Sequence, residues 1–361
     1  MKYLHLTFLL FNVVYVISIN DSKSLRLVEV LFRHGDRTPT ETYTNDPYRS
    51  WPEGWGSLTK VGKRQMFTLG ELLRNTYKDY LAEYYKNDGL VVRSSYAHRC
   101  IMSAQCLLAG LYPPVKEQIW NPSLLWQPIP VTYVPRNEDN VIVMKKPCPV
   151  YETQLKAAYE SQRIKDIDIQ NKELYEYLTF ATGDEVNDIN EVEFLYNTLE
   201  IEMINNLTLP NWTKNVSFDA LREIAKLNLA IFTDNKIMKR LSSGNFLKTV
   251  LSYMTQKIEQ TSKEELILFS GHDITIVSVL RTLGFDHLLK PDYGAYLIFE
   301  LHEVDPQDYE IRFFYGQNFE SSPKHIDLKH CPAPCKLKEF VVGYEDIIPV
   351  DWATECLLDT F

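Results

Sequence analysis

The residues best suited to act on a substrate lie in one short stretch, Arg33 to Pro39 (RHGDRTP). The mostly apolar run 27–32, typical of a buried strand, ends where this stretch begins. Arginine carries a fixed positive charge on a planar fork that matches phosphate. A histidine between two such cations is badly placed to hold a metal ion but well placed to attack a phosphorus atom. The stretch therefore indicates a phosphate site with a histidine nucleophile.

Two further stretches place polar residues at the end of a predicted strand. A short strand over 90–92 ends at Arg93, and a buried strand over 265–270 is followed by His272 and Asp273. Strand ends of this kind meet at one edge of a sheet whose neighbouring strands are parallel. The predicted site, gathered around one cavity, comprises Arg33, His34, Arg37, Arg93, His272 and Asp273.

Charge sets the role of each residue. His34 would attack phosphorus in line and form a covalent phosphohistidine, since the arginines lower its pKa and keep it neutral. Asp273 is the carboxyl best placed to protonate the leaving oxygen. Because arginines favour its ionised form and a bound phosphate dianion favours the protonated form, we expect Asp273 to act as an acid only with substrate bound, and best at low pH. Asp273 could also cap the helix that follows it.

A metal site built from His34, Asp36, His272 and Asp273 is an alternative use of the same residues. The arginines beside these groups would repel a bound cation. We therefore expect no metal and no cofactor, and we assign Asp36 to orienting a neighbouring arginine.

The elements that must position these residues alternate between strands and helices. The pattern predicts an α/β fold with a central mixed, largely parallel sheet flanked by helices. The predicted elements besides the strands already given are helices over 59–77, 98–111, 245–259 and 274–283 and an antiparallel strand pair over 295–303 and 309–315.

Residues 151–240 differ in sequence pattern from the rest of the chain, because helical patterns dominate there. We interpret 151–240 as a smaller helical cap domain, with 19–150 and 241–361 forming the α/β catalytic domain. Residues 40–55 make a long, aromatic loop with prolines, which favours a lid or pocket wall.

Residues 1–18 are typical of a secretory signal peptide, with a basic start and an apolar stretch that ends near a small residue. The stretch is short and interrupted by polar residues, which argues against a membrane anchor. Three glycosylation sequons follow within one segment, at Asn206, Asn211 and Asn215. We therefore expect a secreted glycoprotein without a membrane anchor, in preference to one of the lysosomal lumen. The formal charge of −10 argues against nucleic acid as a partner.

The chain has six cysteines, and some should pair in an oxidising compartment. Cys331 and Cys335 are typical of a tight local disulfide loop. Half a zinc site is the alternative, but a second ligand pair with metal spacing is missing from the sequence. Cys148 and Cys356 remain for a long-range disulfide. The two cysteines of the predicted helix 98–111 point to different faces, which predicts buried thiols.

The motifs carry a family resemblance. Arg33 to Pro39 resembles the RHGxRxP signature of the histidine acid phosphatases, and 270–273 resembles the second motif of that family, around His-Asp. The similarity runs over nearly the whole mature chain and includes 58–62, 120–131 and 207–213. Length and cysteine layout look similar to the prostatic and lysosomal types, and among them to insect venom acid phosphatase-like proteins.

The resemblance implies an α/β domain with a helical cap, hydrolysis of small phosphomonoesters at acid pH, and no metal. It matches His34 to the nucleophile and Asp273 to the proton donor. Members are often dimers, so it also implies a homodimer. The residues that match phosphate binders are Arg33, Arg37, Arg93 and His272.

One stretch departs from the family, since acidic residues often follow the third arginine where this chain has Tyr96 and His98. This difference concerns the pocket wall and substrate preference. Two alternative functions stay open: a phytase or other specialised phosphomonoesterase, and a non-enzymatic secreted protein that binds phosphorylated ligands. The intact His34 and Asp273 argue against the second.

Overall fold

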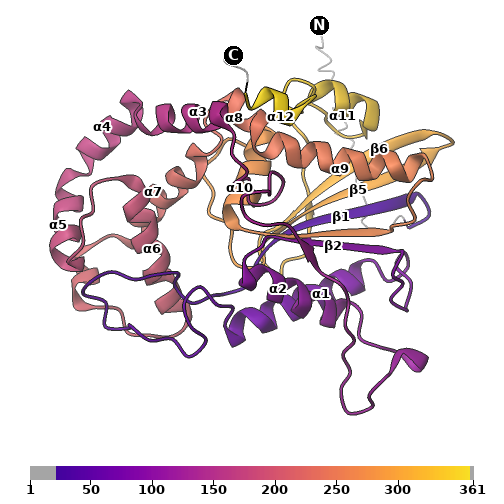
Figure 1. The fold of residues 1–361 in the computed structure, drawn as a ribbon, viewed down its shortest axis with the longest axis horizontal. Coiled ribbons are helices and arrows are strands. Elements are labelled where there is room, and N and C mark those ends of the chain that lie inside the picture. Colours follow the sequence, from indigo (N-terminus) through magenta and orange to yellow (C-terminus); the bar gives the residue numbers. More distant parts are fainter. Residues whose placement is uncertain (1–21, 358–361) are drawn as a thin grey trace, which may run out of the picture.

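The computed structural model describes residues 22–357, and the predicted signal peptide at 1–18 lies outside this range. Within it, eight strands form one mixed sheet in the order β3-β2-β4-β1-β5-β6-β7, with β8 beside β6 (Figure 1). The predicted α/β fold is confirmed. The strands are β1 (Leu25–Arg33), β2 (Leu90–Ser94), β3 (Thr132–Tyr133), β4 (Leu266–Gly271), β5 (Tyr296–Asp305), β6 (Asp308–Gly316), β7 (Lys324–His325) and β8 (Cys335–Lys336).

Helices cover both faces of the sheet and form a separate group at one end (Figure 1). They are α1 (Lys60–Thr76), α2 (His98–Leu111), α3 (Pro149–Tyr159), α4 (Gln162–Gln170), α5 (Lys172–Thr182), α6 (Ile189–Ile204), α7 (Phe218–Ile231), α8 (Lys236–Leu241), α9 (Ser243–Ile258), α10 (Asp273–Thr282), α11 (Leu337–Gly343) and α12 (Trp352–Glu355). The predicted helices at 98–111 and 245–259 correspond to α2 and α9. No helix within the described residues is long and apolar enough to span a membrane.

β1 lies in the middle of the sheet and is buried on both faces. Val30 belongs to the cluster that includes Leu69 of α1 and Leu107 of α2, whereas Leu31 belongs to the cluster that includes Phe246 of α9. A strand covered on both sides needs apolar residues at successive positions, which explains its nearly continuous apolar sequence.

The parallel half of the sheet aligns the three strand ends predicted to meet. β1 and β2 both pair in parallel with β4, so that Arg33 lies opposite Gly271 and Ser94 lies opposite Ser270. The antiparallel half, from β5 onward, extends on the other side of β1. The residues that follow β1, β2 and β4 therefore meet at one edge of the sheet.

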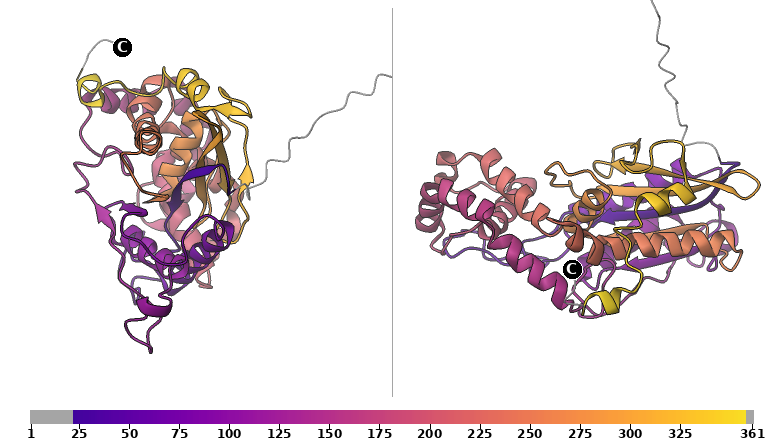
Figure 2. Two further views of the ribbon diagram at one scale, coloured as in Figure 1. Left: turned by 90° about the vertical axis from the view of Figure 1, so that its right-hand side faces the viewer. Right: turned by 90° about the horizontal axis from the view of Figure 1, so that it is seen from above.

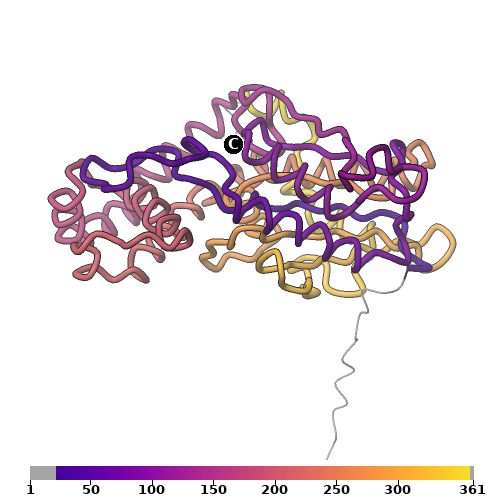
Figure 3. The backbone as a smooth tube through the Cα atoms, turned by 90° about the horizontal axis from the view of Figure 1, so that it is seen from below, coloured from indigo at the N-terminus to yellow at the C-terminus, as the bar shows by residue number. Residues whose placement is uncertain are grey.

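Helices α3 to α8 pack around a core of their own, to which Leu178, Leu199 and Ile231 contribute (Figures 1 and 2). The loop 40–55, which we predicted within the catalytic domain, runs out to these helices (Figure 3). Tyr43 is buried in their core, and the Asn45 amide donates to the Thr182 carbonyl at 2.8 Å. The predicted domain boundaries stay a prediction, but this loop packs on the helical group.

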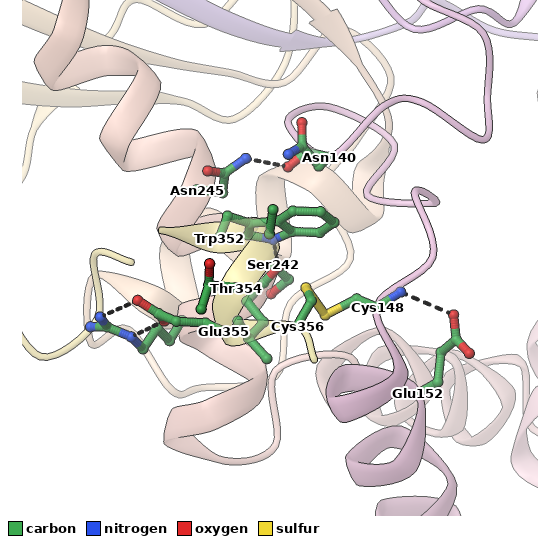
Figure 4. The surroundings of a disulfide bond; sticks show 12 residues. Asn140, Cys148, Glu152, Ser242, Asn245, Trp352, Thr354, Glu355 and Cys356 are labelled. Atoms are coloured by element: carbon green, nitrogen blue, oxygen red, sulfur yellow. Dashed lines mark hydrogen bonds and ion pairs between the residues drawn. A yellow bond between two sulfur atoms is a disulfide. The ribbon is translucent and has the colours of Figure 1, made fainter. Parts of the chain in front are cut away.

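Both predicted disulfides are present. Cys148, just before α3, is bonded to Cys356 at the end of α12 (Figure 4). Cys331 is bonded to Cys335. Trp352 packs beside the first bond and donates from its indole to the Leu241 carbonyl at 2.7 Å. The cysteines of α2 are free thiols, as predicted, but only Cys100 is buried; Cys106 is half-buried, which corrects the prediction that both are buried. The long-range bond therefore fixes the C-terminal segment to the start of the helical group.

Candidate active site

Five of the six predicted residues meet at the carboxyl ends of β1 and β4. His34 follows β1, and its ring centroid lies 5.5 Å from that of His272. Arg33 Nη2 lies 2.8 Å from Asp273 Oδ2, across the two parallel strands. Arg37 lies in the loop after β1, near enough to lower the pKa of His34. The strand ends thus bring a histidine nucleophile candidate, a carboxylate and several cations together.

Two tight approaches hold the motif loop against α1. A Cβ on Gly35 would lie 2.4 Å from the Gly62 carbonyl oxygen, and a Cβ on Gly62 would lie 2.1 Å from the Asp36 carbonyl oxygen. Real side chains do not fit at such distances, so both positions require glycine. Thr59 begins α1 by accepting from the Gly62 amide at 3.0 Å. The start of α1 therefore fixes the backbone on which His34 sits.

Hydrogen bonds fix which ring nitrogen of His34 is free to react. Arg99 Nε lies 3.1 Å from His34 Nε2, and an arginine can donate but not accept, so Nε2 carries the lone pair. Nδ1 then carries the proton and donates to the Gly35 carbonyl at 2.8 Å. Burial, followed by Arg99, His272, Arg33 and Arg37, holds the pKa of His34 well below its usual range. The imidazole is neutral, with Nε2 directed toward a guanidinium.

Arg99, which sequence reasoning missed, takes the place predicted for Arg93. Its guanidinium donates from Nε to His34, and its Nη2 lies 3.4 Å from His272 Nδ1. A sequence signal was present: Arg99 lies in the first turn of α2, which has no acidic residue there. A cation at a helix N-terminus opposes the helix dipole, so a specific partner was to be expected.

Arg93 lies apart from this group, which corrects its prediction as a phosphate binder. It is still within β2, where its backbone pairs with Thr132 and Phe269. Arg93 lines a different, small cavity together with Asp139 and Ile142. No hydrogen bond or ion pair within residues 22–357 joins Arg93 to His34. The site side chains lie on the last residue of β1 or follow the ends of β1 and β4, whereas Arg93 comes one residue before β2 ends.

His272 is held by residues of the β2–α2 connection and of α2. Because Arg99 donates to Nδ1, the proton of the neutral ring lies on Nε2, which donates to Ser95 Oγ at 2.9 Å. The free thiol of Cys100 lies 3.7 Å from the same ring. Burial and then Arg99 lower the pKa of His272 to about 3. His272 is therefore a neutral group beside the nucleophile.

Asp273 is ionised and faces two cations. Burial acts to raise the pKa of Asp273, but the cations Arg33 and Lys290 outweigh it and hold that pKa well below its usual range. Asp273 Oδ1 also accepts from the Ile274 amide at 2.9 Å, at the start of α10. The carboxylate thus lies in the first turn of α10, whose N-cap is His272, and borders the site, and 19% of its side chain remains exposed to an incoming ligand.

The arginines have more donors than protein acceptors. Arg33 donates to the Pro291 carbonyl at 2.6 Å and lies over the Tyr293 ring, but its Nε has no partner among the described residues. The Nε of Arg37 is likewise buried without a partner there. Burial and then Arg37 lower the pKa of Arg99. Buried donors on crowded cations favour an anionic ligand with several oxygens.

A family assignment follows from the comparison with known proteins. The model of the histidine phosphatase superfamily (branch 2) matches residues 24–316. The chain belongs to this superfamily. Human prostatic acid phosphatase is 34% identical over 349 residues, which cover 93% of this chain and 89% of the human protein. Rat lysosomal acid phosphatase is 33% identical over 343 residues, which cover 93% and 81%. The family resemblance inferred from the motifs is confirmed.

Solved structures agree with the superfamily fold. The apo form of Hafnia alvei phytase has a TM-score of 0.70 and 15% identity, and covers 93% of this chain and 98% of its own. The phytase of Klebsiella sp. ASR1 has a TM-score of 0.68 and 16% identity, with the same coverage. At these identities the likeness establishes the fold alone.

Asp36, inside the superfamily motif, has a different role from the predicted one. Its Oδ2 accepts from Thr59 Oγ1 at 2.6 Å and from Asn205 Nδ2 at 3.2 Å. Thr59 caps α1 and Asn205 ends α6. Asp36 therefore ties the motif loop to α1 and to the helical group rather than aligning an arginine.

Proposed function

We propose that the protein is a secreted acid phosphatase that hydrolyses phosphomonoesters through a phosphohistidine on His34. The observation that carries the proposal is the state of His34. Its Nδ1 proton is bound to the Gly35 carbonyl, and its Nε2 lone pair faces Arg99. Membership of the superfamily and relatives named acid phosphatases support the same activity.

In the proposed reaction, the phosphate group of the substrate lies among the cations and displaces Arg99 from His34 Nε2. Nε2 attacks phosphorus while the ester P–O bond breaks, and Asp273 gives its proton to the leaving oxygen. Water then attacks the phosphohistidine, and Asp273 takes a proton from it. Free phosphate leaves, and His34 returns to its neutral state. The proposed phosphate ligands are Arg33, Arg37, Arg99 and His272.

The acid optimum follows from Asp273. Its pKa is well below the usual range, so the free site holds it as a carboxylate. A bound phosphate dianion draws Arg33 away and repels the carboxylate, which raises its proton affinity. Low pH supplies that proton, whereas His34 stays neutral because its own pKa is also lowered. Asp273→Asn should lower turnover of an alkyl phosphate by about 10²–10⁴-fold, and full turnover would refute its role.

The test is hydrolysis of a chromogenic aryl phosphate at acid pH by the glycosylated protein and by His34→Ala. The wild type should turn over, and His34→Ala should fall by on the order of 10⁴-fold or more. Chelation by EDTA should leave the wild-type rate unchanged, since arginines rather than a metal hold the phosphate. A wild type without activity at any pH would contradict the proposal and favour a phosphate-binding protein.

A phytase activity is the second candidate, because the solved structures of similar fold include phytases. Their identity of 15–16% carries no information on substrate. A panel that compares inositol hexakisphosphate with aryl and alkyl monophosphates distinguishes the two. We expect the monophosphates to be preferred, in line with the acid phosphatase relatives.

Secretion and glycosylation are part of the proposal. The sequon asparagines Asn206, Asn211 and Asn215 are all exposed, as an attached glycan requires. The two disulfides are typical of an oxidising compartment. Treatment of the secreted protein with an N-glycosidase should lower its apparent mass. The likeness to venom proteins stays a prediction.

The predicted homodimer also stays a prediction. The segment between α2 and α3 extends away from the body of the molecule (Figures 1 and 2). It carries Trp120, Leu125 and Trp126, of which Trp120 is 58% exposed, so these side chains are not part of the core. An exposed apolar surface of this kind supports association of subunits. Light scattering of the purified protein measures the subunit number.

A further inference from the structure

Lys290 is a buried lysine beside the proposed proton donor. It lies between α10 and β5 and is 3% exposed. Its Nζ donates to Asn197 Oδ1 at 2.7 Å and lies 3.7 Å from Asp273 Oδ2. The same Nζ lies 3.9 Å from Glu200 Oε2. One ammonium therefore joins Asp273 to two residues of α6.

Taking an ammonium out of water is costly, so a buried lysine requires opposite charges and hydrogen bonds that offset the lost hydration. Lys290 meets this requirement with Asn197 and Glu200 from the helical group and Asp273 from α10. Glu200 also accepts from Tyr196 at 2.7 Å, over whose ring the ammonium lies. Its surroundings thus hold the cation at one place.

The two cations on Asp273 differ in what they do when substrate arrives. Arg33 is the nearer, at 2.8 Å, but it is also a proposed phosphate ligand. A phosphate in the site therefore competes with Asp273 for Arg33. Lys290 keeps its partners on α6 and remains beside the carboxyl. Lys290 is then the cation that stays beside Asp273 throughout the reaction.

We propose that Lys290 is a positioning residue for Asp273, which holds this acid in place from α6 and sets the pH above which it stops donating its proton. This inference rests on the proposed function. A neighbouring cation stabilises the carboxylate over the carboxylic acid. Loss of Lys290 should therefore let Asp273 stay protonated to higher pH, and should also leave the carboxyl less well placed.

Other groups face Asp273 as well, and their contributions stay in place in a Lys290 variant. They are Arg33 and His34 from the end of β1, Arg99 and Cys100 from α2, His272 beside it, and Glu193 from α6. A change confined to Lys290 thus isolates one charge.

The experiment compares the pH dependence of kcat for Lys290→Met, Lys290→Arg and wild type on an alkyl phosphate, whose poor leaving group needs the proton. kcat reports the acid in the enzyme–substrate complex. In Lys290→Met the alkaline limb should move up by about one pH unit, and kcat at low pH should fall about tenfold, with a smaller fall on an aryl phosphate. Lys290→Arg should restore the wild-type limb. Lys239→Met, which removes an ion pair with Asp286 remote from the site, should leave the profile unchanged.

An unmoved limb in Lys290→Met, or an equal loss on both substrates at every pH, would overturn the inference, because it indicates a structural role alone. If Lys290→Met does not fold, Glu200→Gln provides the test. It removes a negative charge that partly offsets the charge of Lys290, so the alkaline limb should move to lower pH. An unmoved limb in that variant would also overturn the inference. An inactive wild type would refute the proposed function instead.

Discussion

His34 combines low basicity with a directed lone pair, and both come from its neighbours. The Gly35 carbonyl fixes the proton on Nδ1, while burial and the arginines oppose a second proton. The same arginines that lower the pKa of His34 present donors to an anion. One set of charges therefore keeps the nucleophile neutral and attracts its substrate.

A pair of arginine variants separates the observed site from the one expected from sequence. Arg99→Met should lower kcat/KM on an aryl phosphate by about 10²–10³-fold, because it removes hydrogen-bond donors that stabilise the negative charge on the phosphoryl group in the transition state. Arg93→Met, the matched control on β2, should keep a kcat/KM close to that of the wild type. The opposite order of effects would show that Arg93 binds phosphate.

At the scale of single residues, sequence reasoning worked where a residue lies in the backbone motif and failed where position depends on side-chain direction. His34 directly follows β1 and Asp273 comes two residues after β4, so the alignment of the two strands brings them together. Arg93 and Arg99 are six residues apart, and the choice between them depends on where β2 ends and α2 begins. Lys290 was missed because nothing local distinguishes a loop lysine that becomes buried.

At the scale of elements, periodicity predicted β1, β4, α2 and α9 well because each has a clear apolar pattern. α4 (QRIKDIDIQ) was not predicted, since it is short and polar. It begins at Ser161, whose hydroxyl accepts from the Ile164 amide, and it buries Ile164 against the helical group. Its helical state depends on that tertiary contact more than on its own sequence.

Two carboxyl groups join the loop 40–55 to α6. Glu202 is fully buried, and its neighbour Asp46 from the loop is 3% exposed. Burial and then Asp46 raise the pKa of Glu202 to about 8. Tyr43 and Tyr48 are the other titratable groups in this cluster. Glu202 is neutral at acid pH, and its ionisation opposes the contact between the loop and α6.

The sign of the resulting pH dependence follows from linkage. A raised pKa in the folded state contributes stability that is complete below the ordinary value of 4.5 and is lost as the pH rises through about 8. Relative to Glu202→Gln, the wild type should therefore lose free energy of unfolding between these two pH values. Urea denaturation across this range measures the difference, with the exposed Glu176→Gln as control. A difference independent of pH would contradict the prediction.

At the scale of the whole molecule, the Cys148–Cys356 bond spans 208 residues and the Cys331–Cys335 bond spans 4. The loop-closure model gives about 5 kcal/mol for the first and about 2 kcal/mol for the second. Replacing Cys148 and Cys356 by alanine should therefore lower the free energy of unfolding by more than replacing Cys331 and Cys335. Equal losses in denaturant titrations would contradict this order.

The overall architecture was the most predictable level, because the motif, the alternating elements and the family resemblance all indicate the same α/β fold. The path of the loop 40–55 was not predictable. Its contacts with α5 and with the turn that follows α5 join segments more than a hundred residues apart, and no local pattern encodes them.

The central claim is that phosphate passes through His34. The most direct measurement is a rapid alkaline quench of the enzyme during turnover of a labelled phosphomonoester, followed by peptide mapping, because phosphohistidine survives in alkali. We expect the label on the peptide that contains His34 and no label in His34→Ala. Once the substrate is used up, the labelled wild-type enzyme should decay as fast as free phosphate forms. Turnover without labelled enzyme, or label on another residue, would contradict the account.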